Sequence, residues 1–284
     1  SVRAHLLQAW AVRANDPAAF VAAGFVDGFP GGILTDMPDI SMLWERKEDD
    51  GKTKQADDLE LDAAAHQMDP HIQDASSIND TVKNLIDNKF VDTAKNKREL
   101  TKKVGECVVI SKLMAIAKNV IAGMSKNTPA EKRVVLNLAA SGISAATRLQ
   151  YKAALPRATE VIADILDLMV DLVPGEDIEL LVIDVKNAFW HIPNRAEERK
   201  CFVTWALNLF IIFQRSTQGS RNAALAWCTF AALVGRCVQS LFTGLPMRRE
   251  RTIEEIKLGT YMDDPIAVIR GTLERRKEII ALSV

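Results

Sequence analysis

The sequence contains little of what soft-metal and redox sites are built from. Four cysteines and four histidines occur in 284 residues, and no two cysteines have the CxxC spacing of zinc or redox sites. We therefore expect the four cysteines to be reduced, buried thiols of an intracellular protein. They are Cys107, Cys201, Cys228 and Cys237.

Long hydrophobic runs are also lacking. The two longest mostly apolar stretches, residues 201–213 and 223–235, are shorter than the roughly 18 to 20 residues that a membrane-spanning helix needs. The N-terminal residues lack the charged and apolar regions of a signal peptide. These absences predict a chain without a transmembrane segment or a membrane partner, located in the cytoplasm or the nucleus.

Charge is unevenly distributed along the chain. Residues 1–80 carry 15 acidic and 6 basic side chains, a net charge of -9, and residues 81–160 carry 15 basic and 6 acidic side chains, a net charge of +9. The remaining residues, 161–284, have a net charge of -1. The basic block has the charge of a phosphate-binding surface, although a solvated helical surface would show the same pattern.

Hydrophobic periodicity predicts both helices and strands. Apolar residues that recur every three to four positions indicate helices, and short β-branched runs indicate strands. The run IELLVIDV predicts a strand buried on both faces. The expected helices are at 80–91, 159–173, 223–242 and 272–284, and the expected strands are at 106–110, 132–138 and 178–185.

Two adjacent carboxylates stand in the middle of the apolar stretch KLGTYMDDPIAVI, residues 257–269. The stretch predicts a hairpin with Asp263 and Asp264 at its tip. Asp184 follows another apolar run, and a strand end can lie beside a hairpin tip in one sheet. Three converging carboxylates would suit two Mg²⁺ ions roughly 3.5–4 Å apart. Metal binding would offset the two like charges, and exposure to water is the alternative.

Four ordered motifs resemble those of the reverse transcriptases of retroviruses and retroelements. YMDD resembles the third palm motif, DVKNAF the first and QGSRNAA the second, while KRVVLNL, followed later by LPR, resembles the fingers segment before the palm. The resemblance implies an α+β fold of right-hand polymerase fingers and palm, with an antiparallel palm sheet packed on helices and the thumb missing. The implied regions are an N-terminal accessory region at 1–79, a fingers-like region at 80–160 and a palm at 161–284, truncated before the thumb.

The resemblance also implies a reaction and its partners. An RNA-directed DNA polymerase uses two Mg²⁺ ions, or Mn²⁺, to transfer a nucleotide from a dNTP to a primer 3′-hydroxyl on an RNA or DNA template. The thumb and ribonuclease H segments would have to be supplied separately. The implied metal ligands are the catalytic carboxylates of Asp184, Asp263 and Asp264 and the backbone carbonyl of Val185.

Nucleotide binding would involve residues on several of these motifs. Phe189 would be the steric gate against a ribose 2′-hydroxyl, with an ordinary core aromatic as the alternative. Arg133 would stack on the incoming base and grip its phosphates, with a solvated strand arginine as the alternative. The other implied contacts are Asn187 and Ala188 under the triphosphate, Gln218 and Gly219 in the nucleotide pocket, and Tyr261 and Met262 beside the primer end.

The sequence departs from the family pattern at several positions. Asn137 stands where an aspartate is usual in the fingers, and Thr217 replaces the proline before Gln-Gly. Pro265 removes a backbone donor from the returning strand, which puts the hairpin geometry in question. The chain ends 20 residues after Asp264, which leaves no room for a thumb or a primer grip.

Other functions compete with polymerase activity. A catalytically inactive, retroelement-derived nucleic-acid-binding fragment could keep the basic block without the chemistry. An unrelated α/β domain would require all four motifs to be coincidences. An RNA-templated RNA polymerase shares the palm layout, but Phe189 argues against it because such an enzyme must admit the 2′-hydroxyl.

Overall fold

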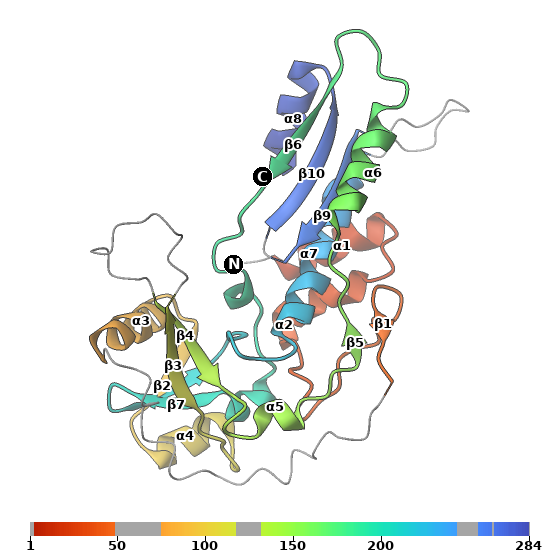
Figure 1. Cartoon of the computed structure of the whole chain (residues 1–284). Helices are drawn as coiled ribbons and strands as arrows, with labels where there is room; N and C mark the ends of the chain where they lie inside the picture. The colour runs from red at the N-terminus through yellow and green to blue at the C-terminus, as the bar shows by residue number, and fades with distance from the viewer. Residues whose placement is uncertain (1–2, 49–74, 118–131, 243–254, 263, 284) are drawn as a thin grey trace.

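The structure, a computed structural model, describes residues 3–48, 75–117, 132–242, 255–262 and 264–283. They form helices packed on small antiparallel sheets, which confirms the α+β class (Figure 1). The helices are α1 Ala4–Arg13, η1 Ala19–Ala23, α2 Gly24–Asp27, α3 Ala75–Asp87, α4 Lys97–Val104, α5 Ile143–Ala146, α6 Ala158–Met169, η3 Ala188–His191, η4 Ala196–Cys201, α7 Ala223–Gln239 and α8 Leu273–Ser283. The strands are β1 Glu45–Arg46, β2 Val91–Ala94, β3 Lys112–Ala117, β4 Lys132–Asn137, β5 Tyr151–Lys152, β6 Asp177–Val182, β7 Val203–Ala206, β8 Leu209–Phe213, β9 Ile256–Tyr261 and β10 Asp264–Gly271.

One sheet carries the predicted hairpin and has the order β6-β10-β9. Ile256 of β9 faces Ile269 of β10 across the sheet, and both are buried in a cluster with residues of α7 and α8. Helix α6 lies on the opposite face, where Lys257 contacts Asp167 at 3.1 Å. The sheet is therefore covered by α7 and α8 on one face and by α6 over part of the other.

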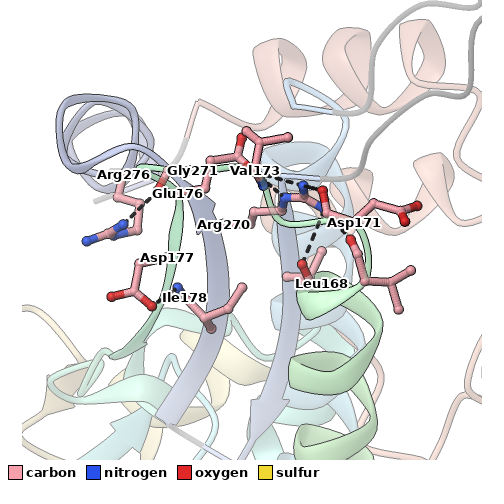
Figure 2. Close-up of polar contacts among 10 residues, drawn as sticks. Leu168, Asp171, Val173, Glu176, Asp177, Ile178, Arg270, Gly271 and Arg276 are labelled. Atoms are coloured by element: carbon pink, nitrogen blue, oxygen red, sulfur yellow. Dashed lines mark hydrogen bonds and ion pairs between the residues drawn. The ribbon is translucent and has the colours of Figure 1, made fainter.

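Arg270 ties β10 to the C-terminal end of α6 (Figure 2). Its side chain is buried and its guanidinium donates to the carbonyls of Leu168, Val170 and Asp171 and to the carboxylate of Glu176. Carbonyls at a helix C-terminus have no partner within the helix. Arg270 satisfies them and so fixes both α6 and the turn before β6 on the sheet.

The second three-stranded sheet has the order β2-β8-β7 and lies at the other end of the molecule, near α4 and the β3-β4 pair (Figure 1). It joins a strand from residues 80–160 with two strands from residues 161–284. The aromatic rings of Phe90, Trp190 and Phe213 stack beside it, with centroids 5.4 and 6.1 Å apart. The two predicted regions thus share one sheet and one apolar cluster.

The N-terminal residues pack on the rest of the molecule. Helices α1 and η1 contribute to the cluster built on α7, and Asp16 accepts two hydrogen bonds from Arg236 of α7. Glu198 of η4 is fully buried and accepts hydrogen bonds from backbone amides of the loop before β1. The donors are the amides of Gly31, Ile33, Leu34 and Thr35.

Most predicted elements are found, and three predictions are wrong. The segment 106–110 forms only a single bridge, from Ile110 to Val203, because its valines are buried by side-chain packing without a ladder partner. Strand β6 is not buried on both faces, since Val182 is 62% exposed and α6 does not reach that end of the sheet. Cys107 is exposed, whereas the other three cysteines are buried as predicted.

Candidate functional site

Asp184 comes two residues after β6, the strand that neighbours the hairpin strand β10. Strand β6 pairs antiparallel with β10, and the amide of Ile183 donates to the carbonyl of Pro265 at 2.9 Å, which extends the ladder beyond β6. The ladder of β6 ends at Val182, and the same register, continued by one residue beyond Ile183, would bring Asp184 opposite Asp264. Directly opposed residues project to the same face, with Cβ atoms about 4.5–5.5 Å apart. In that continued register the two carboxylates would share one face of the sheet.

The hairpin itself is anchored on α7. Strands β9 and β10 pair up to Tyr261 and Asp264, and Met262 has the left-handed backbone conformation, with φ of 54°. The indole Nε1 of Trp227 donates to the carbonyl of Met262 at 2.6 Å. Asp263 lies outside the described residues. The turn is thus held from one side by a buried tryptophan of the central helix.

Pro265 does not prevent the hairpin, contrary to the expected difficulty. Its carbonyl accepts from Ile183 of β6, and in an antiparallel pair the amide and carbonyl of one residue point to the same neighbouring strand. The missing donor therefore faces β6, and the pairing between Asp264 and Tyr261 loses nothing. The proline removes one bond at the end of the β6 ladder only.

The face that carries Asp264 is open at the end near the carboxylates. Side chains alternate along β10, so Asp264, Ile266 and Arg270 point to the side opposite α7 and α8. Helix α6 covers that side near Arg270. At the other end, Leu180 and Val182 are 53% and 62% exposed. A large ligand can therefore reach this end of the sheet.

The segment that follows Asp184 packs on the same core as the hairpin. Val185, Phe189 and Met262 are partly buried against the cluster on α7. Asn187 is left-handed, with φ of 61°, a conformation that asparagine tolerates better than most residues. It starts η3, and Ala188 behind it is buried. Phe189 combines a core contact with partial exposure, so it is consistent with both expected roles.

The QGSRNAA segment contacts β4, the strand formed by the KRVVLNL segment. The carbonyl of Gln218 accepts from the amide of Leu136 at 3.2 Å. Gly219 has φ of 107°, and a Cβ there would collide with the Leu136 carbonyl oxygen, which requires glycine. Arg133 is exposed and lies on the same strand face as Val135, the side chain nearest to Gly219. Two expected nucleotide-binding elements are therefore neighbours.

Some residues that shape this region were not predicted as site residues. Trp227 supports the hairpin, but a single tryptophan in an apolar helix carries no sequence signal for that role. Among the described residues, no group of three His, Cys, Asp or Glu side chains is arranged to hold a metal ion. Asp184 and Asp264 are the expected ligands within that part, and the third, Asp263, lies outside it.

Comparison with known proteins supplies no further assignment. No protein-family model matches the chain, and no curated protein is significantly similar to it. The helices that the structure describes include none that is long and apolar enough to cross a membrane.

Proposed function

We propose that the chain is the fingers-and-palm core of a retroelement RNA-directed DNA polymerase. The observation that supports this most directly is the antiparallel register of β6 and β10, with the Ile183 amide bonded to the Pro265 carbonyl. Continued by one residue, this register would bring Asp184 opposite Asp264 beside the tip of the YMDD hairpin. The two residues are 80 positions apart in the sequence. An accidental pair of motifs would have no reason to meet at one end of one open sheet face.

The donor set fits hard divalent cations. Carboxylate oxygens of Asp184 and Asp264 and the backbone carbonyl of Val185 are ligands of the kind that Mg²⁺ takes in proteins. Asp263 would complete the set. Two Mg²⁺ ions held there would activate the primer hydroxyl and neutralise charge on the triphosphate. The chain itself would orient the primer end with Tyr261, which is half exposed beside the tip.

The nucleotide would lie between the aspartates and β4. Arg133 has no ion pair among the described residues. Its guanidinium can donate two parallel hydrogen bonds to phosphate oxygens. The Gln218-Gly219 turn next to it presents backbone close to the ligand. Phe189 would limit the space beside the sugar. Polymerisation in such a site relies on positioning and charge stabilisation rather than on a covalent intermediate.

Primer extension on poly(rA)–oligo(dT) with Mg²⁺ tests this function. Asp184→Asn should reduce extension by at least about 100-fold, a typical effect of losing one preorganised electrostatic group, with an unchanged melting temperature. Asp177→Asn is the matched control, because Asp177 is exposed at the other end of the same strand. Its variant should extend the primer like the wild type.

Two results would contradict the proposal. Equal extension by the wild type and Asp184→Asn would exclude the assigned ligand. A wild type that binds the template without extending the primer would instead support a catalytically inactive, retroelement-derived nucleic-acid-binding protein.

A further inference from the structure

Two arginines that belong to none of the polymerase motifs are anchored on one short segment, residues 191–194, which begins at the end of η3. Arg199 Nε donates to the carbonyl of Asn194 at 3.2 Å, and an Nη of Arg215 donates to the carbonyl of His191 at 3.5 Å. The buried side-chain amide of Asn194 donates in turn to the carbonyl of Arg215 at 2.8 Å. Arg199 comes from η4 and Arg215 follows β8, so the fold holds two distant cations on one segment.

Neither guanidinium has a carboxylate partner in the part of the chain that the structure describes. The two carboxylates whose charge reaches Arg199 are Asp92 and Glu197. Asp92 pairs with Lys103 at 3.0 Å, a lysine that Glu99 also contacts at 3.4 Å, and Glu197 pairs with Arg195 at 3.1 Å. Among the described residues, neither Arg199 nor Arg215 therefore has a carboxylate within ion-pair distance.

These charges are also partly withdrawn from water. Burial lowers the pKa of Arg199, and the neighbouring charge of Arg215 lowers it further. Burial likewise lowers the pKa of Arg215. Two like charges anchored on one segment in a half-buried position are unfavourable unless an anion offsets them. The planar donor fork of a guanidinium matches the oxygens of phosphate and of carboxylate, and fits other common biological anions less well.

We propose that Arg199 and Arg215 form a phosphate-binding site that grips one backbone phosphate of a bound nucleic acid. The chemistry shared by all candidate ligands is a phosphate group with two accessible oxygens. The choice of a nucleic-acid backbone over a free phosphate rests on the proposed function, in which Arg133 would hold the phosphates of the nucleotide. The site would position the template or primer strand without reading its sequence.

Binding of a fluorescent single-stranded oligonucleotide, followed by anisotropy over a range of NaCl concentrations, tests the site. The double variant Arg199→Gln/Arg215→Gln should bind at least about tenfold more weakly, as expected from losing a charge-assisted hydrogen bond. The slope of log K against log salt should fall by roughly 0.7, the value for one phosphate contact on a single strand. Arg199→Lys/Arg215→Lys should keep the slope and lose only part of the affinity.

The matched control is Arg275→Gln/Arg276→Gln, which makes the same change in net charge. Both of these arginines already pair with glutamates, at 2.7 and 3.0 Å, so this variant should retain the wild-type slope. Melting temperatures show whether each variant is folded. If the double glutamine variant is not, the lysine variant and Arg215→Gln alone give the same comparison.

The outcomes separate this site from the proposed function. Titration of inorganic pyrophosphate into the same variants is the second measurement. An unchanged slope and unchanged pyrophosphate binding in the folded double variant overturn the site, whatever the polymerase assay gives. Normal oligonucleotide binding with lost pyrophosphate binding overturns only the assignment to a nucleic-acid backbone. A wild type that extends no primer contradicts the polymerase proposal, whereas a reduced slope in the double variant supports the site even then.

Discussion

The two three-stranded sheets have similar layouts and opposite burial. The central strand β8 is packed on both faces, since Ile211 belongs to one apolar cluster and Ile212 to another. The central strand β10 is buried only in its second half. Its first half, from Asp264 to Ile266, is half-buried and borders the exposed Val182. The same strand order therefore gives one sheet closed to solvent and one that opens at its end.

The difference separates stability from ligand access. A sheet covered on both faces contributes most of its surface to the apolar core. A sheet with one open end gives up part of that contribution and exposes polar groups to a ligand. We expect substitutions in β8 to affect folding first and substitutions near the hairpin tip to affect activity first.

The largest expected difference in stability is between Ile211→Ala and Val182→Ala. Ile211 is fully buried, so its truncation should lower the free energy of unfolding by about 3–4 kcal/mol through lost burial and a cavity. Val182 is mostly exposed, and its truncation should change the free energy by less than about 1 kcal/mol. Urea denaturation of both variants measures the two values. Similar losses would refute the contrast between the sheets.

Arg270→Met should have the next largest effect. The variant leaves three carbonyls at the end of α6 and the Glu176 carboxylate without their donor, which should cost about 2–3 kcal/mol of unfolding free energy. Arg276→Met is the comparison, because Arg276 pairs with the more exposed Glu179, and should cost about 1 kcal/mol. Chemical denaturation distinguishes them. A smaller loss for Arg270 would mean that the guanidinium does not hold α6.

Trp227→Phe tests how the open end of the sheet is supported. The variant keeps an aromatic ring and loses the donor to the Met262 carbonyl, which should cost about 1 kcal/mol of stability and reduce primer extension. Trp44→Phe is the matched control, because it loses a similar bond, to the hydroxyl of Thr229 at 2.9 Å, and keeps the donor to the Met262 carbonyl. Equal extension by the two variants would show that this anchor does not position the tip.

The smallest expected effect is on the pH dependence of the free energy of unfolding. The hydrogen bond from Arg270 lowers the pKa of Glu176, so the folded protein holds this carboxylate ionised at a lower pH than the unfolded chain does. This contribution to stability is present above about pH 4.3, the ordinary value for glutamate, and is lost as the pH falls through the folded-state pKa. The difference in unfolding free energy between wild type and Glu176→Gln should be constant from pH 5 to 7 and shrink below pH 4. A constant difference down to pH 3 would contradict this linkage.

Sequence patterns predicted the elements with strong periodicity. The apolar run of α7 and the two short runs around YMDD were predicted correctly because their spacing and length admit few alternatives. The segment 106–110 was mistaken for a strand because an apolar β-branched run is also compatible with irregular buried chain. The roles assigned to Phe189 and Arg133 remain predictions.

The sequence by itself determined the hairpin and the presence of three carboxylates in apolar surroundings, because these depend on residues close together in the chain. Only the tertiary structure decided that the Ile183 amide bonds the Pro265 carbonyl beside the hairpin, that β6 is open, and that Arg199 and Arg215 are anchored on one segment. Each of these depends on contacts between residues that are distant in sequence. Register and burial follow from the packing of whole elements, which local patterns do not specify.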